Sequence, residues 1–297
     1  MASIYTQIDQ NKRGTLLIIA AFIGVIAAIG WFLGEFYFEG SGLFFIGIAL
    51  IFSSVSGFVS YYNSDKMVLA ISGAHEVAPT ENEYLHNLVE NISIASGLPK
   101  PKVFMIEDTA LNAFATGRDP EHGVVCVTTG IVNTLEKREL EGVIAHEMSH
   151  IGNYDTRFMT IVSILVGSIA LIADFFTRGM FYGGGRKRGS GGGILMLIGV
   201  VLIILSPIFA TLIKLALSRQ REYLADATSA MITRYPKGLA DALLKLGTDV
   251  EVLEAANGAT AHLYISNPLK GGHGGLMSSL FSTHPPIEDR IARLLQM

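Results

Sequence analysis

Long runs of apolar residues dominate four parts of this chain, with polar stretches between them. The runs cover residues 15–33, 42–61, about 158–176 and about 194–213. A helix needs roughly 20 mostly apolar residues to cross a bilayer. We therefore expect an α-helical membrane protein with four transmembrane helices, arranged as two hairpins.

The first apolar run differs from a secretory signal peptide. Its uncharged stretch is longer than the hydrophobic part of a signal peptide, which has about 7–15 residues, and no A-x-A-like cleavage site follows it cleanly. A second run begins at residue 42. The pattern predicts an uncleaved helical hairpin within residues 1–62.

The polar pieces read as a mixed α and β domain in two halves. In residues 81–96, Leu85, Leu88, Val89 and Ile92 recur at helical spacing. Short runs that favour strands follow, and helical patterns lead to the C-terminus. Two or three strands are expected, at 102–107, at 123–129 and, as an extended stretch that would form an edge, at 112–116. The helices are expected at 133–152, 214–231, 237–246 and after Pro286. The halves would be residues 63–157 and 214–297, separated by a second hairpin at 158–213.

Composition agrees with a membrane protein and excludes some partners. Half of the residues are hydrophobic and only 16% are charged, whereas soluble domains have about a quarter charged. The net charge of −4 gives no broad basic field, so we expect no nucleic-acid partner. The single cysteine, Cys126, can form no internal disulfide.

The stretch AHEMSH at residues 145–150 has the spacing of a metal site. Positions i and i+4 share one helix face, so His146 and His150 can present two imidazoles to one ion. Glu147 can then reach a water on that ion without being a ligand. The alternative is an ordinary amphipathic helix. The charged flank LEKREL at 135–140 places this helix outside the hydrocarbon core.

A zinc hydrolase needs a third protein ligand and an open position for water. The pattern H-E-x-x-H-x-x-G-x-x-H fails here, because residues 153 and 156 are Asn153 and Thr156. The stretch REYLADA at 221–227 instead offers Glu222 as a ligand. Asp226, one turn later, can accept the ring N–H of a ligand histidine, as zinc-bound histidines usually require.

Four motifs together resemble the M48 metallopeptidases, and among them the HtpX-like membrane-bound zinc proteases. They are NAFATG, EGVIAHEMSH, SRQREYLADA and STHPPIEDRI, in this order over nearly the whole chain. The resemblance implies a zincin-like α+β catalytic domain with one zinc ion per chain. It also implies Glu147 as general base, and misfolded or damaged membrane proteins as substrates in quality control.

Several further residues have more than one interpretation. His284 is a candidate donor to the oxyanion, near the site by resemblance, or a structural histidine at a turn. The stretch Asn112, Ala113, Phe114 and Ala115 is either an edge strand that pairs with an extended substrate or an ordinary strand or turn. Arg290 either pairs with an acidic group near the site or is a solvated charge. The other histidines lack ligand spacing and read as surface or core residues: His75, His86, His122, His262 and His273.

The charge pattern predicts the orientation in the membrane. Lys12 and Arg13 precede the first run, whereas the loop at 35–41 has two glutamates and no basic residue. The positive-inside rule then puts the N-terminus in the cytoplasm. His146, His150 and Glu222 must meet on one side, which requires an even number of crossings between them. We expect a multi-pass protein of the inner (plasma) membrane whose catalytic domain faces the cytoplasm.

The loop between the third and fourth runs conflicts with this orientation. It has Arg178, Arg186, Lys187 and Arg188 but would lie outside. The first hairpin usually dominates orientation, so we keep the assignment. A shallow hairpin at 158–213 is the alternative to two full crossings.

Two other functions fit parts of the pattern. The prenyl-protein (CaaX-type) endopeptidase branch of the same family has more spans, which enclose a large chamber, so four spans argue against it. A non-catalytic membrane scaffold with a structural zinc ion has no need of Glu147. The leading hypothesis is a membrane-bound zinc endopeptidase that acts on proteins.

Overall fold

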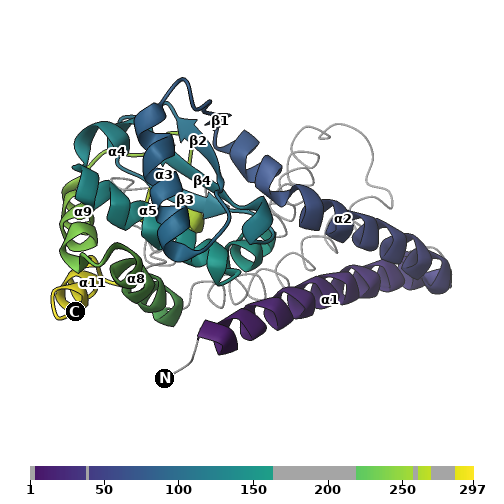
Figure 1. Cartoon of the computed structure of the whole chain (residues 1–297). Helices are drawn as coiled ribbons and strands as arrows, with labels where there is room; N and C mark the ends of the chain where they lie inside the picture. The colour runs from purple at the N-terminus through teal and green to yellow at the C-terminus, as the bar shows by residue number, and fades with distance from the viewer. Residues whose placement is uncertain (1–3, 38–39, 163–218, 257–259, 269–284) are drawn as a thin grey trace. The chain divides into compact units, whose positions relative to one another are not determined.

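The structure is a computed structural model that describes residues 4–37, 40–162, 219–256, 260–268 and 285–297 (Figure 1). The chain divides into two compact units. The first unit consists of residues 1–12, 63–160 and 217–297, and the second of residues 13–62 and 161–216.

A four-stranded mixed sheet lies at the centre of the first unit (Figure 1). Its strands are β1 (His75–Glu76), β2 (Lys102–Ile106), β3 (Ala113–Thr116) and β4 (Val124–Thr128). They are ordered β1-β2-β4-β3, with β2 parallel to β4 and β3 antiparallel to it. The three predicted strands are confirmed. The two-residue β1 is too short to give a sequence pattern.

Strands β3 and β4 are buried on both faces of the sheet, and residues of β2, β3 and β4 alternate between two hydrophobic clusters. On one face, Val103 of β2 and Val125 of β4 pack with apolar residues of α3 (Glu83–Ser96) and α5 (Lys137–Gly152). On the other face, Phe114 and Cys126 pack with residues such as Tyr264. Strands buried on both faces read as continuous apolar runs, as β4 does.

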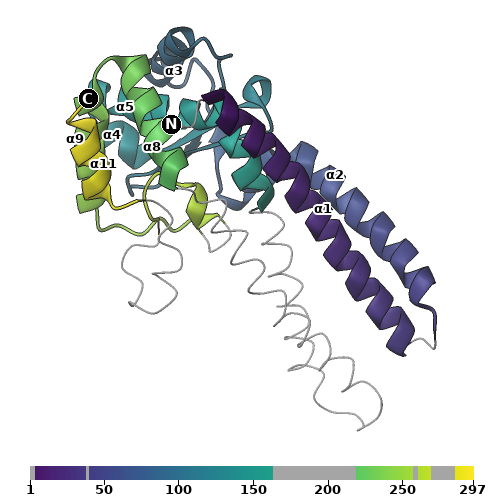
Figure 2. The ribbon, with the colours of Figure 1, turned by 90° about the horizontal axis from the view of Figure 1, so that it is seen from below.

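Two helices from the second half of the sequence, α8 (Arg219–Thr233) and α9 (Pro236–Thr248), pack against α5. A third, α11 (Ile287–Leu294), packs against α8 and α9 (Figure 2). Gly142 allows α5 and α9 to approach closely, since a Cβ there would lie 2.7 Å from the backbone nitrogen of Leu239. Ser229 Oγ of α8 donates to the Gly142 carbonyl at 2.8 Å. These contacts hold α9 and α8 against α5.

The expectation of one helix over 133–152 was wrong at its start. A short helix, α4 (Thr129–Thr134), ends before α5 begins at Lys137. Glu136 caps α5, and its backbone N–H donates to Glu139 Oε2 at 2.7 Å. This reciprocal capping box satisfies backbone donors that would otherwise be orphaned at the helix start.

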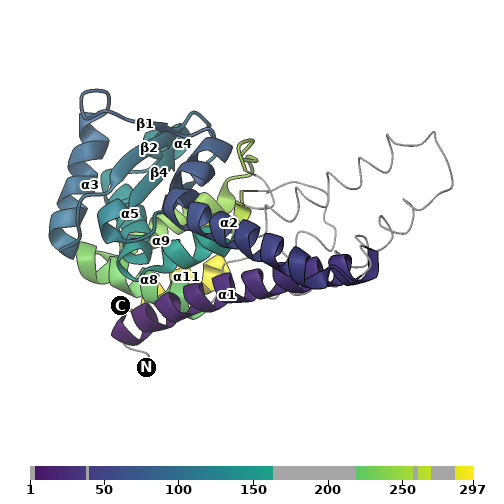
Figure 3. The same ribbon diagram turned by 90° about the vertical axis from the view of Figure 1, so that its right-hand side faces the viewer.

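Two apolar helices contribute most of the described part of the second unit. These are α1 (Ile4–Tyr37) and α2 (Gly42–Ile71), which lie side by side within that unit (Figures 1 and 3). Among the described residues, they are the two helices long and apolar enough to cross a membrane, with mean hydropathies of 2.5 and 2.2. A Cβ at Gly30 would lie 2.7 Å from the Ala49 Cβ, so small residues allow the close packing.

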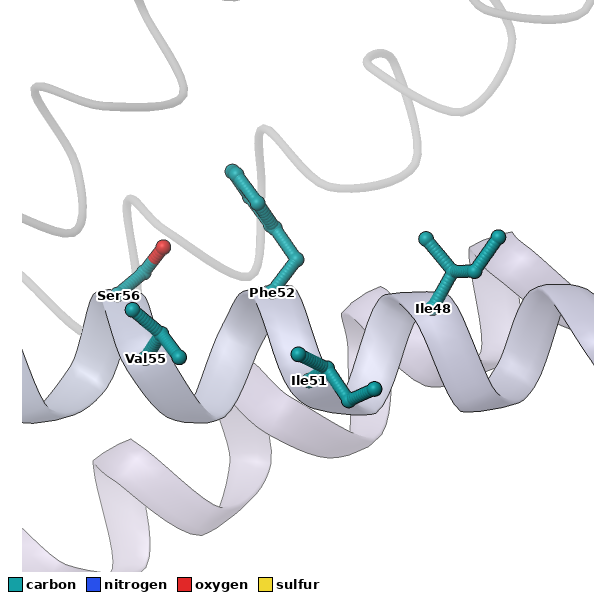
Figure 4. Close-up of a pocket in the computed structure, with 5 residues that line it drawn as sticks. All are labelled: Ile48, Ile51, Phe52, Val55 and Ser56. Atoms are coloured by element: carbon teal, nitrogen blue, oxygen red, sulfur yellow. The ribbon is translucent and has the colours of Figure 1, made fainter.

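One face of α2 exposes large apolar side chains. Ile48, Ile51, Phe52 and Val55 are 48–69% exposed, and with Ser56 they line a pocket of about 450 Å³ (Figure 4). An apolar face of this kind is stable in lipid rather than in water. The predicted third and fourth spans lie almost entirely outside the described residues; residues 155–162 are helical.

Candidate metal centre

The two histidines of AHEMSH face each other on the buried side of α5. His146 and His150 are both buried, and their Nε2 atoms lie 3.2 Å apart. The helix is held in this position by its capped start and by its packing against α8 and α9. The i, i+4 spacing has therefore produced one pair of convergent nitrogen atoms, as expected.

The carboxylate of Glu222 on α8 lies close to the Nε2 atoms of both histidines. Its Oε2 lies 3.7 Å from His146 Nε2, and its Oε1 lies 3.6 Å from His150 Nε2. Ligands about 2.1 Å from a tetrahedral ion lie roughly 3.4 Å from one another. The potential ligand atoms of the three residues all lie within 4.8 Å of one another. The arrangement fits a single metal ion with two nitrogen ligands and one oxygen ligand.

The second ring nitrogen of His146 faces a carboxylate. His146 Nδ1 lies 3.0 Å from Asp226 Oδ1, and Asp226 is one turn after Glu222 on α8. An N–H at Nδ1 that donates to this carboxylate leaves Nε2 unprotonated and directed at Glu222 and His150. The structure thus places Asp226 where the sequence led us to expect it, beside a candidate ligand histidine.

His150 has a carboxylate partner that the sequence analysis missed. Its Nδ1 lies 3.0 Å from Asp155 Oδ2. On a continuous helix, Asp155 would lie about 140° around the axis from His150. However, α5 ends at Gly152, and Tyr154 has a left-handed backbone with φ of 61°. This turn brings Asp155 back to the histidine, so helical spacing alone could not have indicated it.

Arg290 of α11 is completely buried and holds Asp226. Its Nε donates to Asp226 Oδ2 at 2.9 Å, and its Nη2 donates to Oδ1 at 2.7 Å. Its Nη1 lies 3.7 Å from Glu222 Oε2. Of the two interpretations of Arg290, the one that pairs it with an acidic group near the site is confirmed. A fixed bidentate pair of this kind orients the carboxylate that in turn orients His146.

The buried charges around the histidines leave a negative surplus. Buried charges are costly unless they are paired or coordinate a metal. The site contains four buried carboxylates and two buried guanidinium groups. Its formal charge is therefore −2, which a divalent cation would neutralise. The charged groups are Glu147, Asp155, Glu222, Asp226, Arg221 and Arg290.

The electrostatic surroundings affect the two histidines differently. Burial, with the nearby Arg290, lowers the pKa of His146 to about 4 despite the hydrogen bond with Asp226. Burial also disfavours charge on His150, but the Asp155 hydrogen bond and the charges of Glu222, Asp155 and Glu147 outweigh it and raise its pKa to about 9. In the metal-free chain, a proton on His150 offsets part of the negative surplus.

The predicted substrate-binding strand is paired with the chain's own backbone. Asn112 Nδ2 donates to the carbonyl of Ser266 at 3.0 Å, and the Ile265 N–H donates to the Ala113 carbonyl at 2.9 Å. A further bridge joins Phe114 to Tyr264. Ala115 lies on the same strand, β3, which is at the end of the sheet order.

The remaining histidines lie in the core, at the surface or outside the described residues. His86 is buried, with Nε2 2.8 Å from the Val77 carbonyl, and His262 is buried near Met159. His75 and His122 are exposed and lie near Glu107 and Asp119. The predictions for His273 and His284 lie outside the described residues.

Comparison with known proteins agrees with the geometry. Residues 79–297 match the profile of peptidase family M48. The chain is 48% identical over 295 residues to a protein named Protease HtpX homolog from Dictyoglomus thermophilum, covering 99% of this chain and 95% of that one. It is 45% identical to the protein of the same name from Thermoanaerobacter pseudethanolicus, covering 98% and 97%.

A solved structure shares the fold. The crystal structure of Ste24p from S. mikatae is similar with a TM-score of 0.51 and 18% identity, over 98% of this chain and 67% of that one. At this identity the likeness concerns the fold alone. The family profile and the full-length relatives are the stronger findings, and by them the chain belongs to peptidase family M48 and is a membrane metallopeptidase.

Proposed function

We propose that the chain is a zinc-dependent endopeptidase of the inner membrane that cleaves misfolded or damaged membrane proteins. The observation that carries the proposal is the convergence of His146, His150 and Glu222 within 4.8 Å, in a buried site with surplus negative charge. Two imidazoles and one carboxylate are a ligand set of catalytic zinc sites, which keep one position open. Protein substrates follow from membership in a peptidase family.

Glu147 is the proposed general base. A bound zinc ion supplies two effects, a lower pKa of its water and a polarised scissile carbonyl. The Glu147 carboxylate accepts the proton of the attacking water and passes it to the nitrogen of the leaving amine. Glu147 is 2% exposed and directly follows His146 on α5, so its carboxylate belongs to the same buried site.

Residues 112–115 are the proposed binding site for the substrate backbone. Support comes from the bonds that residues 112–114 already make with residues 264–266. A substrate strand would make the same kind of backbone bonds in place of that segment. His284 is the proposed donor to the tetrahedral oxyanion, on the strength of the THPP motif.

The proposed architecture has four transmembrane helices and a cytoplasmic catalytic domain. The hairpins would be residues 1–62 and 158–213, and the zincin-like catalytic domain would combine residues 63–157 and 214–297. The apolar helices α1 and α2 and the basic pair Lys12 and Arg13 support the first hairpin and its orientation. The lipid bilayer is then a direct partner of the chain.

Cleavage of an unfolded membrane protein tests the proposal. The detergent-purified, zinc-loaded chain is incubated with the substrate beside the Glu147→Gln variant, and zinc content is measured for both. We expect cleavage by the wild type alone and about one zinc ion in each. A wild type that binds no zinc, or a variant that cleaves equally well, would contradict the proposal. A prenylated peptide in a parallel reaction tests the CaaX-type alternative.

A further inference from the structure

A residue near the start of the first helix reaches the partner of a candidate metal ligand. Asn11 of α1 is 2% exposed, and its Nδ2 donates to Asp155 Oδ1 at 2.6 Å and to the Asn153 carbonyl at 2.9 Å. All three residues belong to the first unit. The other oxygen of Asp155 faces His150 Nδ1 at 3.0 Å. One side chain of α1 therefore holds both the turn after α5 and the carboxylate that faces His150.

The other end of the Asn11 amide is fixed as well. Arg221 Nη1 donates to Asn11 Oδ1 at 3.3 Å, and Arg221 Nε lies 3.5 Å from Asp155 Oδ1. Arg221 directly precedes Glu222, the candidate third ligand, on α8. Asn11 thus joins the segment after α5 to the start of α8. A buried amide with its donor and acceptor both used has a fixed orientation.

The next residue of α1 makes a second contact with the same turn. Lys12 Nζ lies 4.3 Å from the centre of the Tyr154 ring. Tyr154 is the residue with a left-handed backbone that returns Asp155 to His150. The conformation on which the His150–Asp155 pair depends is therefore contacted by two consecutive residues of α1.

From these contacts we infer that Asn11 is a positioning residue of the metal site. It fixes the Asp155 carboxylate, which accepts the N–H at Nδ1 of His150 and so orients the ring with Nε2 towards the metal. The inference rests on the proposed function, because it assumes that His150 binds the metal. It adds that metal affinity depends on α1, a single helix that continues from Ile4 to Tyr37 through the apolar window at Ile8–Phe32.

The test measures metal binding by the full-length chain in detergent. Asn11→Leu removes every hydrogen bond of the amide at nearly constant shape, and Asn11→Ala is a second variant. Gln10→Leu, at the exposed neighbouring position, is the matched control. Zinc affinity is measured by competition with a chelator, and the cobalt-substituted site by its visible absorption. Circular dichroism reports whether each variant is folded.

We expect the Asn11 variants to bind zinc about tenfold more weakly, at the lower end of the effect of outer hydrogen-bond partners. Their cobalt spectrum should change, while Gln10→Leu stays at wild type. In an Asp155→Ala background, Asn11→Leu should cause no further loss, because it acts through Asp155.

Three outcomes would overturn the inference. The first is a folded Asn11 variant with wild-type affinity and spectrum, and the second is a failure of both variants to fold, which would make Asn11 a folding determinant. The third is an additive loss in the Asp155→Ala background. None of these affects the proposed function if the wild type binds zinc and cleaves protein, whereas a wild type that takes up neither metal overturns both.

Discussion

His150 Nδ1 lies 3.0 Å from Asp155 Oδ2, across a turn in which Tyr154 has a left-handed backbone. The same relation holds between His146 and Asp226 at 3.0 Å. Each candidate ligand histidine thus has its own carboxylate, one from the segment after α5 and one from α8. Each carboxylate accepts from Nδ1 of its histidine, so both Nε2 atoms face Glu222.

Removal of the Asp155 carboxylate should weaken metal binding. In Asp155→Ala, the Nδ1 of His150 loses its acceptor, so the ring is free to rotate and to change tautomer. We expect zinc affinity to fall about 10- to 100-fold, measured by competition with a chelator. Asp241→Ala, which removes an exposed carboxylate paired with Lys237, is the control and should bind zinc as the wild type does. Equal affinities for the two variants would show that Asp155 does not support the site.

Zinc affinity should rise with pH, because His150 must lose a proton to bind the metal. The pKa of His150 in the metal-free chain is raised to about 9, whereas that of His146 is lowered to about 4. Between about pH 6.5 and 8 only His150 has a proton to release, so affinity should increase by about tenfold per pH unit. Chelator competition at several pH values measures the slope. A flat profile would contradict the raised pKa.

The same shift predicts the stability of the metal-free chain. A histidine whose pKa is higher in the folded state stabilises the fold below its ordinary pKa of 6.5, and this contribution disappears as the pH rises towards 9. The metal-free protein should therefore unfold at lower denaturant concentration at pH 9 than at pH 6.5. Asp155→Ala lacks the hydrogen bond that raises the pKa, and its stability should change less over this range.

Residues related by local spacing could be predicted from the sequence, and those related by tertiary contacts could not. The i, i+4 rule related His146 to His150 and Glu222 to Asp226, and alternation and β-branched content gave three strands of the sheet. Asp155 depends on a left-handed turn at Tyr154.

Two further contacts depend on packing between distant segments. Asn11 reaches the site from a helix that sequence analysis assigned to the membrane hairpin. The pairing of residues 264–266 with β3 had no signal, because that segment is too short and irregular to show alternation. For Arg290, sequence left two interpretations, and only the packing of α11 against α8 distinguishes them.

Loss of the Arg290 guanidinium should destabilise the first unit. Arg290→Ala would leave Asp226 buried without its bidentate partner, and removal of one member of a buried ion pair costs about 3–5 kcal/mol. We expect the free energy of unfolding to fall by about this amount. Denaturant titration of the metal-free chain measures it. Arg293→Ala changes an exposed arginine of the same helix and should have a small effect. Similar losses for both variants would mean that helix α11 as a whole, rather than the buried pair, is sensitive to substitution.

The contact of α5 with α9 at Gly142 offers a test of the scaffold that does not alter any side chain of the metal site. In Gly142→Ala, the new Cβ would lie 2.7 Å from the Leu239 nitrogen and 2.9 Å from its Cα, so backbone must move. Overpacking of this kind costs about 1–3 kcal/mol. Because Gly142 lies one turn before His146 on α5, we also expect weaker zinc binding.

Gly152→Ala is the matched control, since its Cβ would meet only the side chain of Leu98, at 3.1 Å, which can shift. Denaturant titration and chelator competition on both variants separate the two effects: a stability loss in Gly142→Ala with unchanged zinc affinity would show that the metal site tolerates a displaced α5.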